Sequence, residues 1–193
     1  MIRKIVHYDA PVLRAKGREV GRITPPIRAL VTDLLDSMRA ARGVGLAAQQ
    51  IGEAVQVAVI DVTGIKERPS RMWIDDQLVD PEEFMPLVLI DPVVKATKSK
   101  VVSHEGCLSF PGLTLDISRS QRVSVKTRTL DGGTFEFDAG GLLCRAVLHE
   151  VDHLHGKLFI DHVDAKTRRE IKEDLEYIKR GEPIPARAKE DES

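Results

Sequence analysis

The ten residues 147–156, VLHEVDHLHG, place the strongest constraint on the fold, because their chemistry depends on a helix. On a helix, His149 and His153 lie one turn apart on the same face, where both can reach a single metal ion. Glu150 lies about 100° further round, close enough to contact a water at that metal without being a ligand. The spacing HExxH therefore predicts a helix over residues 141–155 that carries two metal ligands and a general base.

The third ligand decides the class of metal site. One large group of metallopeptidases has a histidine six residues after the second one, but Phe159 occupies that place. A later acid, Glu170 or Glu173, would give a peptidase site of two histidines and one glutamate. Both acids belong to a segment rich in lysine and arginine, a pattern more typical of solvated helix surface.

The two cysteines offer another choice of ligand. Cys144 is five residues before His149, which turns it about 140° away from the ligand face, so an ordinary core thiol is expected there. Cys107 follows a glycine and would, taken alone, be a buried small hydrophobe. Because two histidines need a third partner, the pair favours Cys107 as a thiolate ligand. Such a site leaves the fourth position open for water or substrate.

The segment GVGLAAQQIG, residues 43–52, has the small residues that a dinucleotide-binding loop would need. It follows a predicted helix rather than a strand, which excludes that interpretation. The glycines instead indicate backbone that packs close to a ligand or to another segment. One of the two amides, Gln49 or Gln50, could donate to a developing oxyanion, or the pair could be a simple polar edge.

The rest of the chain predicts one α+β domain over residues 1–193 with a polar tail at about 182–193. We expect antiparallel or mixed β-sheets packed around the central HExxH helix, with an N-terminal and a C-terminal helix. The two outer helices are predicted after the caps Thr24 and Asp164 and end at Gly43 and Gly181. Strands are predicted at residues 55–62, 87–94, 122–129 and 134–137, the last two as a hairpin. Pro92 should break the second of these strands or hold it to a sheet edge, and residues 63–85 should form a long loop or insertion.

Composition excludes several classes of function. Apolar residues make up 42% of the 193 residues and charged residues 31%, with a net charge of −1. This balance is typical of a soluble globular protein, with no basic surface for nucleic acid and no bulk attraction to an anionic membrane. No apolar run approaches the ~20 residues that cross a bilayer, and two cysteines are too few for a disulfide framework. The cytoplasm is therefore the expected location.

Three motifs in a fixed order give the chain a resemblance to the peptide deformylases. They are GxGLAAxQ at residues 43–50, EGCLS at residues 105–109 and HExDH at residues 149–153, and HYDAPVL at residues 7–13 and LFID at residues 158–161 also resemble the family. The resemblance implies one ferrous ion on Cys107, His149 and His153, with zinc, nickel or cobalt as substitutes. It implies N-formyl-methionyl nascent polypeptides as substrates, and a metal-bound hydroxide that attacks the formyl carbon and releases formate.

The same resemblance assigns a role to each matching residue. Glu150 is implied as general base and later acid, and the Gln50 side chain and the Leu108 backbone N–H as donors to the oxyanion. Val44 and Gly45 are implied to lie along the bound peptide. A monomer is expected, and contact with the ribosome exit region is left open.

Four features depart from the family pattern. They are Gln49 beside the catalytic amide, Leu148 before the first helix histidine, Ser120 after Arg119, and the length of residues 63–85. None of them is a ligand, so they bear on rate, specificity and loop geometry. Two rival functions stay open: a metallopeptidase with a helix acid as third ligand, and a structural zinc domain with His104 or His162 as fourth ligand.

Overall fold

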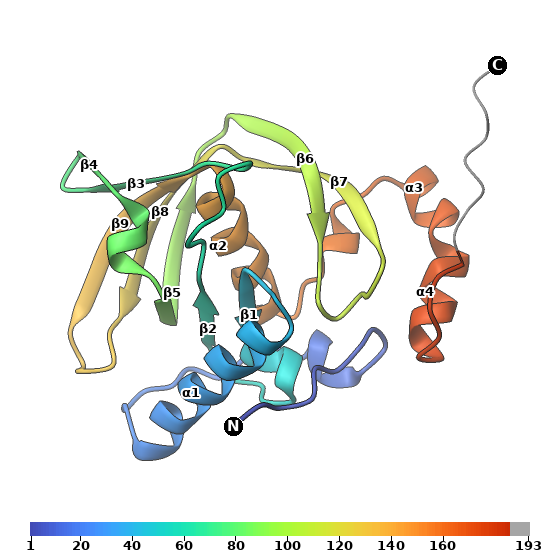
Figure 1. Cartoon of the computed structure of the whole chain (residues 1–193), viewed down its shortest axis with the longest axis horizontal. Coiled ribbons are helices and arrows are strands. Elements are labelled where there is room, and N and C mark those ends of the chain that lie inside the picture. Colours follow the sequence, from blue (N-terminus) through green and yellow to red (C-terminus); the bar gives the residue numbers. More distant parts are fainter. Residues whose placement is uncertain (186–193) are drawn as a thin grey trace.

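Nine strands form two antiparallel sheets in residues 1–185, the part of the chain that this computed structural model describes (Figure 1). The larger sheet has the order β1-β2-β5-β8-β9-β3-β4, and β6 pairs with β7 in a separate two-stranded sheet. The strands are β1 (Gly45–Ala47), β2 (Val57–Ile60), β3 (Ser70–Ile74), β4 (Gln77–Val79), β5 (Leu87–Ala96), β6 (Lys100–Gly106), β7 (Thr114–Ser120), β8 (Arg122–Arg128) and β9 (Thr134–Gly140). The helices are α1 (Pro25–Ala40), α2 (Gly141–Leu154), α3 (Ala165–Glu170) and α4 (Lys172–Lys179). The predicted α+β class is confirmed, and most of the predicted polar tail at 182–193 lies outside the described residues.

Helix α2 packs against one face of the larger sheet and contacts β1, β2, β3 and β9. Its side chains Leu143 and Val147 are fully buried against Ala58 and Ile60 of β2 and other residues of the same cluster. Helix α1 packs on the opposite face, against Val57 and Val59. Because successive side chains of a strand point to opposite faces, the run VAVI of β2 is buried on both sides. Helix α2, which carries the HExxH motif, is therefore packed into the hydrophobic core.

A third cluster of apolar residues joins the C-terminal helices to the small sheet. It contains Phe110, which follows the EGCLS motif, and Phe159, whose ring meets that of Phe110 edge to face at 5.1 Å. Helices α3 and α4 add Ile171, Leu175 and Ile178, as the spacing of these residues predicts. Figure 1 shows both helices beside β7 at one end of the molecule.

The three predicted helices occur, with differences at their ends. Helix α2 covers the predicted residues to within one position, and α1 begins at Pro25, although the Thr24 side chain makes no capping hydrogen bond and the helix ends at Ala40. The predicted C-terminal helix is divided into α3 and α4 at Ile171, whose ψ of 0° interrupts the helical geometry. Asp164 caps α3 by accepting a hydrogen bond from the Thr167 N–H at 2.7 Å.

The prediction of a loop at residues 63–85 is wrong. Strands β3 and β4 form a hairpin there, and β3 pairs with β9 of the larger sheet. The turn consists of Asp75 and Asp76, which have positive φ angles of 49° and 61°. Two such residues suit the tight turns of β-hairpins, and aspartate tolerates this conformation better than most residues. The sequence pattern that identifies strands was weak in this segment, because Met72 is the only fully buried side chain of β3 and β4.

The position of β5 corrects a second prediction. Pro92 does not hold this strand to an edge, since β5 lies between β2 and β8. The register instead shifts between Ile90 and Val93, and Asp91 adopts a positive φ of 48°. A bulge of this kind accommodates a residue that cannot donate to the ladder, so proline is tolerated inside the sheet.

Candidate active site

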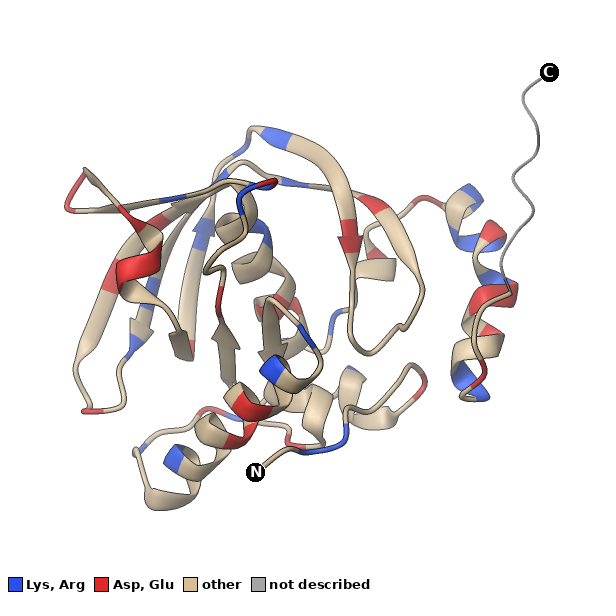
Figure 2. Ribbon diagram, viewed as in Figure 1, with Lys and Arg blue, Asp and Glu red and all other residues tan. Residues whose placement is uncertain are grey.

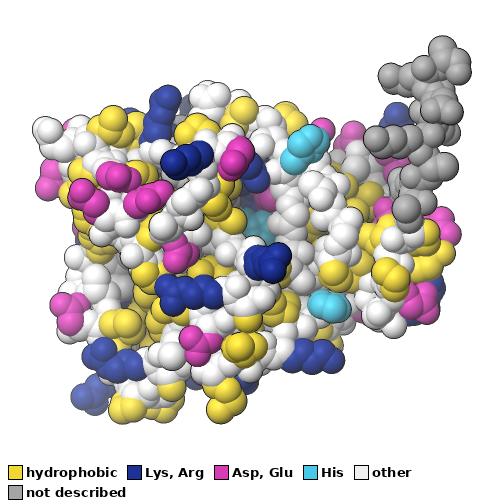
Figure 3. Space-filling view, in the orientation of Figure 1, with side chains coloured by type: hydrophobic (Ala, Val, Ile, Leu, Met, Phe, Trp, Pro, Cys, Tyr) yellow, Lys and Arg dark blue, Asp and Glu magenta, His cyan; other side chains and the backbone are white. Residues whose placement is uncertain are grey.

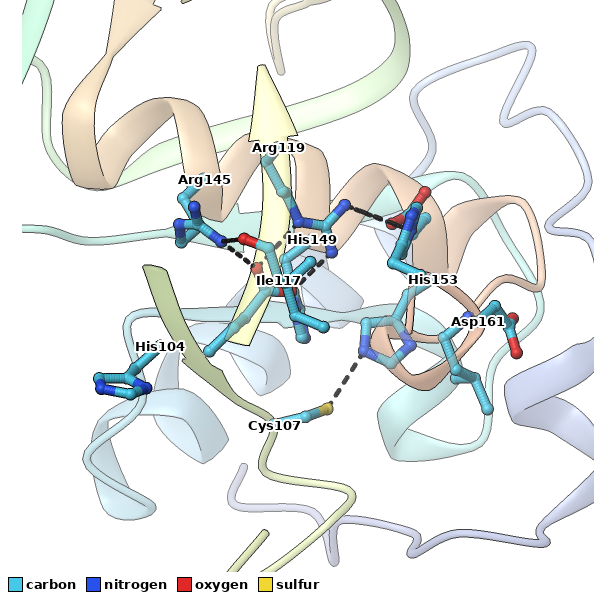
Figure 4. A network of polar contacts seen from close by, with 12 residues as sticks. His104, Cys107, Ile117, Arg119, Arg145, His149, His153 and Asp161 are labelled. Carbon is cyan, nitrogen blue, oxygen red and sulfur yellow. Dashed lines mark hydrogen bonds and ion pairs between the residues drawn. The ribbon is translucent and has the colours of Figure 1, made fainter. Parts of the chain in front are cut away.

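Cys107, His149 and His153 come together where the loop after β6 meets helix α2. One ligand atom from each residue lies within 4.8 Å of the other two, and Cys107 Sγ lies 3.3 Å from His153 Nε2. Figure 4 shows the thiol and the imidazole facing one another. One thiolate and two neutral imidazoles are a donor set that zinc and the other late first-row metals accept. The three residues therefore fit a divalent metal ion, and residues 1–185 contain no second group of this kind.

A buried carboxylate orients the first histidine. Glu105 Oε1 lies 2.7 Å from His149 Nδ1, which leaves Nε2 of the ring for the ligand position. Glu105 also accepts hydrogen bonds from both Arg119 and Arg145. Burial alone would raise the pKa of Glu105, but the hydrogen bonds from Arg119 and His149 outweigh it and hold the pKa far below its usual value. Because Glu105 is ionised, His149 Nδ1 donates to it, which fixes the tautomer of a metal-ligating histidine.

Arg119 extends this network toward the surface. Its Nη1 donates to Asp152 Oδ2 at 2.6 Å, and the same oxygen lies 2.7 Å from His162 Nε2. Figure 4 shows Arg119, which comes from β7, between Arg145 and the end of α2. Sequence reasoning assigned no role to Glu105, Arg119 or Asp152. A signal was present, since Glu105 and Asp152 are charged residues inside the two motifs that supply the ligands.

Glu150 follows His149 on α2 and lines a cavity of about 450 Å³ together with Cys107 and His149. The side chain is 3% exposed, and its Oε2 has no hydrogen-bond partner among the described residues. Burial raises the pKa of Glu150 to about 7. A buried carboxyl with a raised pKa in the lining of a cavity is suited to exchange protons with a bound molecule.

Gly45 makes room for this glutamate. A Cβ atom at position 45 would lie 2.4 Å from Glu150 Oε1 and 2.9 Å from its Cδ, well inside van der Waals contact. The glycine of the GxGLAAxQ motif is thus explained by close approach, as its sequence context indicates. Val44 and Gly45 both line the cavity, where an extended chain could lie along them.

Gln50 and Leu108 also line the cavity. The Gln50 Oε1 accepts from the Ala47 N–H at 2.9 Å, so its Nε2 points toward Cys107 Sγ at 3.5 Å and Ser109 Oγ at 3.3 Å. The Leu108 N–H follows the end of β6, and no described residue accepts a hydrogen bond from it. The structure thus brings all eight predicted site residues together. Seven of them line the cavity, and His153 belongs with Cys107 and His149 to the group that could hold a metal ion.

The three single-residue departures from the family pattern differ in how the fold accommodates them. Gln49 is fully buried and neither of its amide atoms has a partner among the described residues, while Gly17 leaves the space its Nε2 occupies. Leu148 packs against the core, and Glu105 supplies the hydrogen bond to the neighbouring His149. The Ser120 hydroxyl donates to the Thr97 carbonyl at 2.7 Å.

None of the rival ligands lies in the metal group. Glu170 and Glu173 are exposed on α3 and α4. The side chain of His104 is 80% exposed and pairs with Asp116 at 2.6 Å, and Figure 4 shows it apart from Cys107. His162 faces Asp152, as described above. Cys144 is buried, where burial raises the pKa of its thiol to about 11, so it is the inert core thiol that its helical position predicts.

Replacing Glu105 with Gln tests whether this carboxylate supports the metal site. We expect metal affinity to fall about 10–100-fold, the usual cost of losing a group that orients a ligand. Competition with a chelator measures the effect, and thermal unfolding reports the state of the fold. Asp116→Asn is the matched control, because it neutralises an exposed carboxylate that also pairs with a histidine. Equal metal affinity in Glu105→Gln and wild type would contradict the orienting role.

A buried carboxyl and a group of one cysteine and two histidines at a shared cavity are the parts of a metal-dependent hydrolase. The match to known proteins is more specific. The chain belongs to the peptide deformylase family, since the family model for polypeptide deformylase matches residues 2–169. Its reaction is therefore removal of the N-formyl group from nascent peptides.

Individual relatives agree with this assignment. The peptide deformylase of Methylacidiphilum infernorum is 52% identical over 184 residues, which are 95% of this chain and 96% of that protein. The crystal structure of a peptide deformylase from Legionella pneumophila has a TM-score of 0.78 at 33% identity and covers 93% of this chain and 96% of its own. A peptide deformylase from Ehrlichia chaffeensis, solved in complex with actinonin, has a TM-score of 0.78 at 30% identity and covers 95% and 99% of the two chains.

Proposed function

We propose that Cys107, His149 and His153 hold one ferrous ion per chain and that the substrates are N-formyl-methionyl nascent polypeptides. The observation that carries the proposal is the buried Glu150, which lines the cavity beside Cys107 and His149 and has one oxygen without a partner among the described residues. When bound, a divalent ion supplies a Lewis acid that brings the pKa of water near 7. One thiolate and two imidazoles would also accept zinc, nickel or cobalt. The choice of iron rests on the resemblance of the motifs.

The side chains of this protein would divide the work of amide hydrolysis among them. Glu150 takes a proton from the attacking water and later delivers it to the nitrogen that leaves as the free α-amine. The Gln50 Nε2 and the Leu108 N–H donate to the oxyanion that develops on the formyl oxygen. Val44 and Gly45 contact the backbone of the peptide and keep the formyl carbon beside Glu150. Formate then leaves as the carbon–nitrogen bond breaks.

The test is formate release from a formyl-Met tripeptide. The protein is purified without oxygen, its bound metal is removed with a chelator, and separate samples are reloaded with iron, zinc, nickel or cobalt. We expect formate and free amine in equal amounts, fastest with iron, and little release of acetate from the N-acetyl tripeptide. A folded, iron-loaded protein that releases no formate would overturn the proposal, and faster turnover with zinc would overturn the choice of metal.

Replacing Gln50 with Ala should retain the metal and lower turnover by on the order of 10²–10³, the typical effect of one lost oxyanion donor. Gln50→Glu is the matched variant, because it keeps an oxygen for the Ala47 N–H but removes the donor at Nε2. Single-turnover formate release, normalised to bound metal, measures both. Unchanged turnover in the two variants would remove Gln50 from the mechanism.

The cellular setting is part of the proposal. No helix of the described residues is long and apolar enough to cross a membrane. A cytoplasmic location would suit the free thiol of Cys107, which a reducing compartment preserves. Figure 2 shows both signs of charge side by side along α4. The absence of direct nucleic-acid binding stays a prediction from the composition. A monomer, a single domain over residues 1–193 and contact with the ribosome exit region stay predictions.

A further inference from the structure

We propose that this enzyme favours substrates with Asp or Glu at the two residues that follow formyl-methionine. The inference rests on the proposed function and concerns Arg42 and Arg68, two exposed arginines that line the catalytic cavity. They come from segments far apart in the sequence, the end of α1 and the loop before β3. Neither has a carboxylate partner among the described residues.

Arg42 stands at the start of the segment that would bind the peptide. Its φ of 55° lies in the left-handed region, which few residues other than glycine adopt. The conformation is held by hydrogen bonds from the Arg42 N–H to the Arg39 carbonyl and from the Gly43 N–H to the Met38 carbonyl, at 3.0 and 2.9 Å. The backbone is therefore fixed, while no described residue forms a hydrogen bond or ion pair with the guanidinium.

Arg68 lies in the segment before β3. Its Nη2 donates to the carbonyl of His104 at 3.2 Å, which ties this segment to β6, the strand that leads to Cys107. A carbonyl oxygen carries no full negative charge, so the positive charge of the guanidinium is not neutralised by this contact. The segment thus brings a second positive charge to the cavity.

The acids near the cavity do not neutralise these two charges. Glu105 and Glu150 are the only carboxylates among the described residues that line it, and both are buried. Glu105 is already paired with Arg119 and Arg145, and Glu150 has the catalytic position. Glu67 is exposed beside Arg68 but does not line the cavity. Figure 3 shows Lys and Arg side chains beside the hollow on this face.

The two positive charges lie where the chain of a bound substrate would emerge from the cavity. A peptide whose formyl group lies beside Glu150 and whose backbone follows Val44 and Gly45 must pass the mouth of the cavity. Extended chain advances about 3.3 Å per residue, so the two residues after methionine lie roughly 7–10 Å from the formyl carbon. Their side chains are the first that can meet Arg42 and Arg68. Asp or Glu side chains of the substrate at these two positions would be attracted to the arginines. This attraction would raise the rate at which peptide and enzyme meet and would hold the bound peptide in register.

The test compares kcat/KM for three formyl peptides, formyl-Met-Glu-Glu-Ala, formyl-Met-Gln-Gln-Ala and formyl-Met-Lys-Lys-Ala, each with an amidated C-terminus. Exposed ion pairs are individually weak, so we expect the Glu peptide to exceed the Gln peptide by about three- to tenfold at low salt, with the Lys peptide slowest. The ratio of Glu to Gln should fall toward one in Arg42→Gln/Arg68→Gln and in wild type at about 0.5 M salt, where screening is short-ranged. Arg169→Gln is the matched control, because it removes an exposed arginine of α3 that lies outside this cavity.

The outcomes separate this inference from the proposed function. Equal kcat/KM for the three peptides in wild type would overturn the preference and leave the deformylase reaction intact. A preference that persists in the double variant, or at high salt, would show that these arginines do not cause it. If the double variant fails to fold, the single variants Arg42→Gln and Arg68→Gln take its place, and each should lower the ratio of Glu to Gln at low salt, whereas an unchanged ratio in both would overturn the inference. No formate from any peptide would overturn the proposed function and this inference together.

Discussion

Replacing Glu150 with Gln is expected to lower formate release by on the order of 10²–10⁴, the range that a positioned general base contributes. The amide has nearly the shape of the carboxyl and fits the same buried position, but it cannot take a proton from water. Cys107, His149 and His153 are unchanged, so metal content should equal that of wild type. Formate release per bound metal is the measurement, with iron loaded to the same level in both proteins.

A second variant separates proton transfer from packing. In Gly45→Ala the carboxyl remains, but the new Cβ would lie 2.4 Å from Glu150 Oε1 in the present geometry, so the glutamate must move. We expect this variant to lose activity while it keeps the metal. An active, iron-loaded Glu150→Gln would contradict the role of Glu150 as base, whatever the behaviour of Gly45→Ala.

The positions of the predicted site residues follow from patterns that a sequence displays directly. The HExxH spacing predicts one helix face, and the structure places His149 and His153 on it. The third ligand could not be derived from spacing, because Cys107 is 42 residues before His149 in the printed sequence and reaches it only through the fold. For the third ligand the order of the three motifs was informative, since it indicated a family in which the EGCLS and HExDH segments supply ligands to one metal.

The parts that sequence reasoning missed depend on partners distant in the chain. Glu105 becomes an anionic support for His149 only because Arg119 and Arg145 converge on it from β7 and α2. The hairpin of β3 and β4 gains its stability from pairing with β9, which no local pattern in residues 63–85 displays. The bulge at Pro92 likewise depends on β8 on one side and β2 on the other. Local signals predicted the helices and the strands β2, β5, β8 and β9, whereas these features arise from contacts between elements.

Replacing Cys107 with Ser is expected to lower metal affinity by at least on the order of 100-fold, because losing even a group that orients a ligand costs 10–100-fold. A serine hydroxyl stays protonated near neutral pH, so the site loses both a donor and a negative charge. The remaining histidines, His149 and His153, cannot complete a stable site alone. Equilibrium titration with zinc or cobalt against a chelator measures the affinity, and formate release should fall with metal content.

This experiment also decides between the deformylase site and the metallopeptidase site. A peptidase that used Glu170 or Glu173 as its third ligand would keep its metal in Cys107→Ser, since the thiol would have no part in binding. Both acids are exposed on α3 and α4, outside the metal group, which argues against that site. Cys144→Ser is the matched control, because it changes a buried thiol that donates to the Ser120 carbonyl at 3.2 Å, and serine can make the same bond. We expect Cys144→Ser to bind metal as wild type does, so that full affinity in both variants would exclude Cys107 as a ligand, whereas loss in Cys107→Ser alone would establish it.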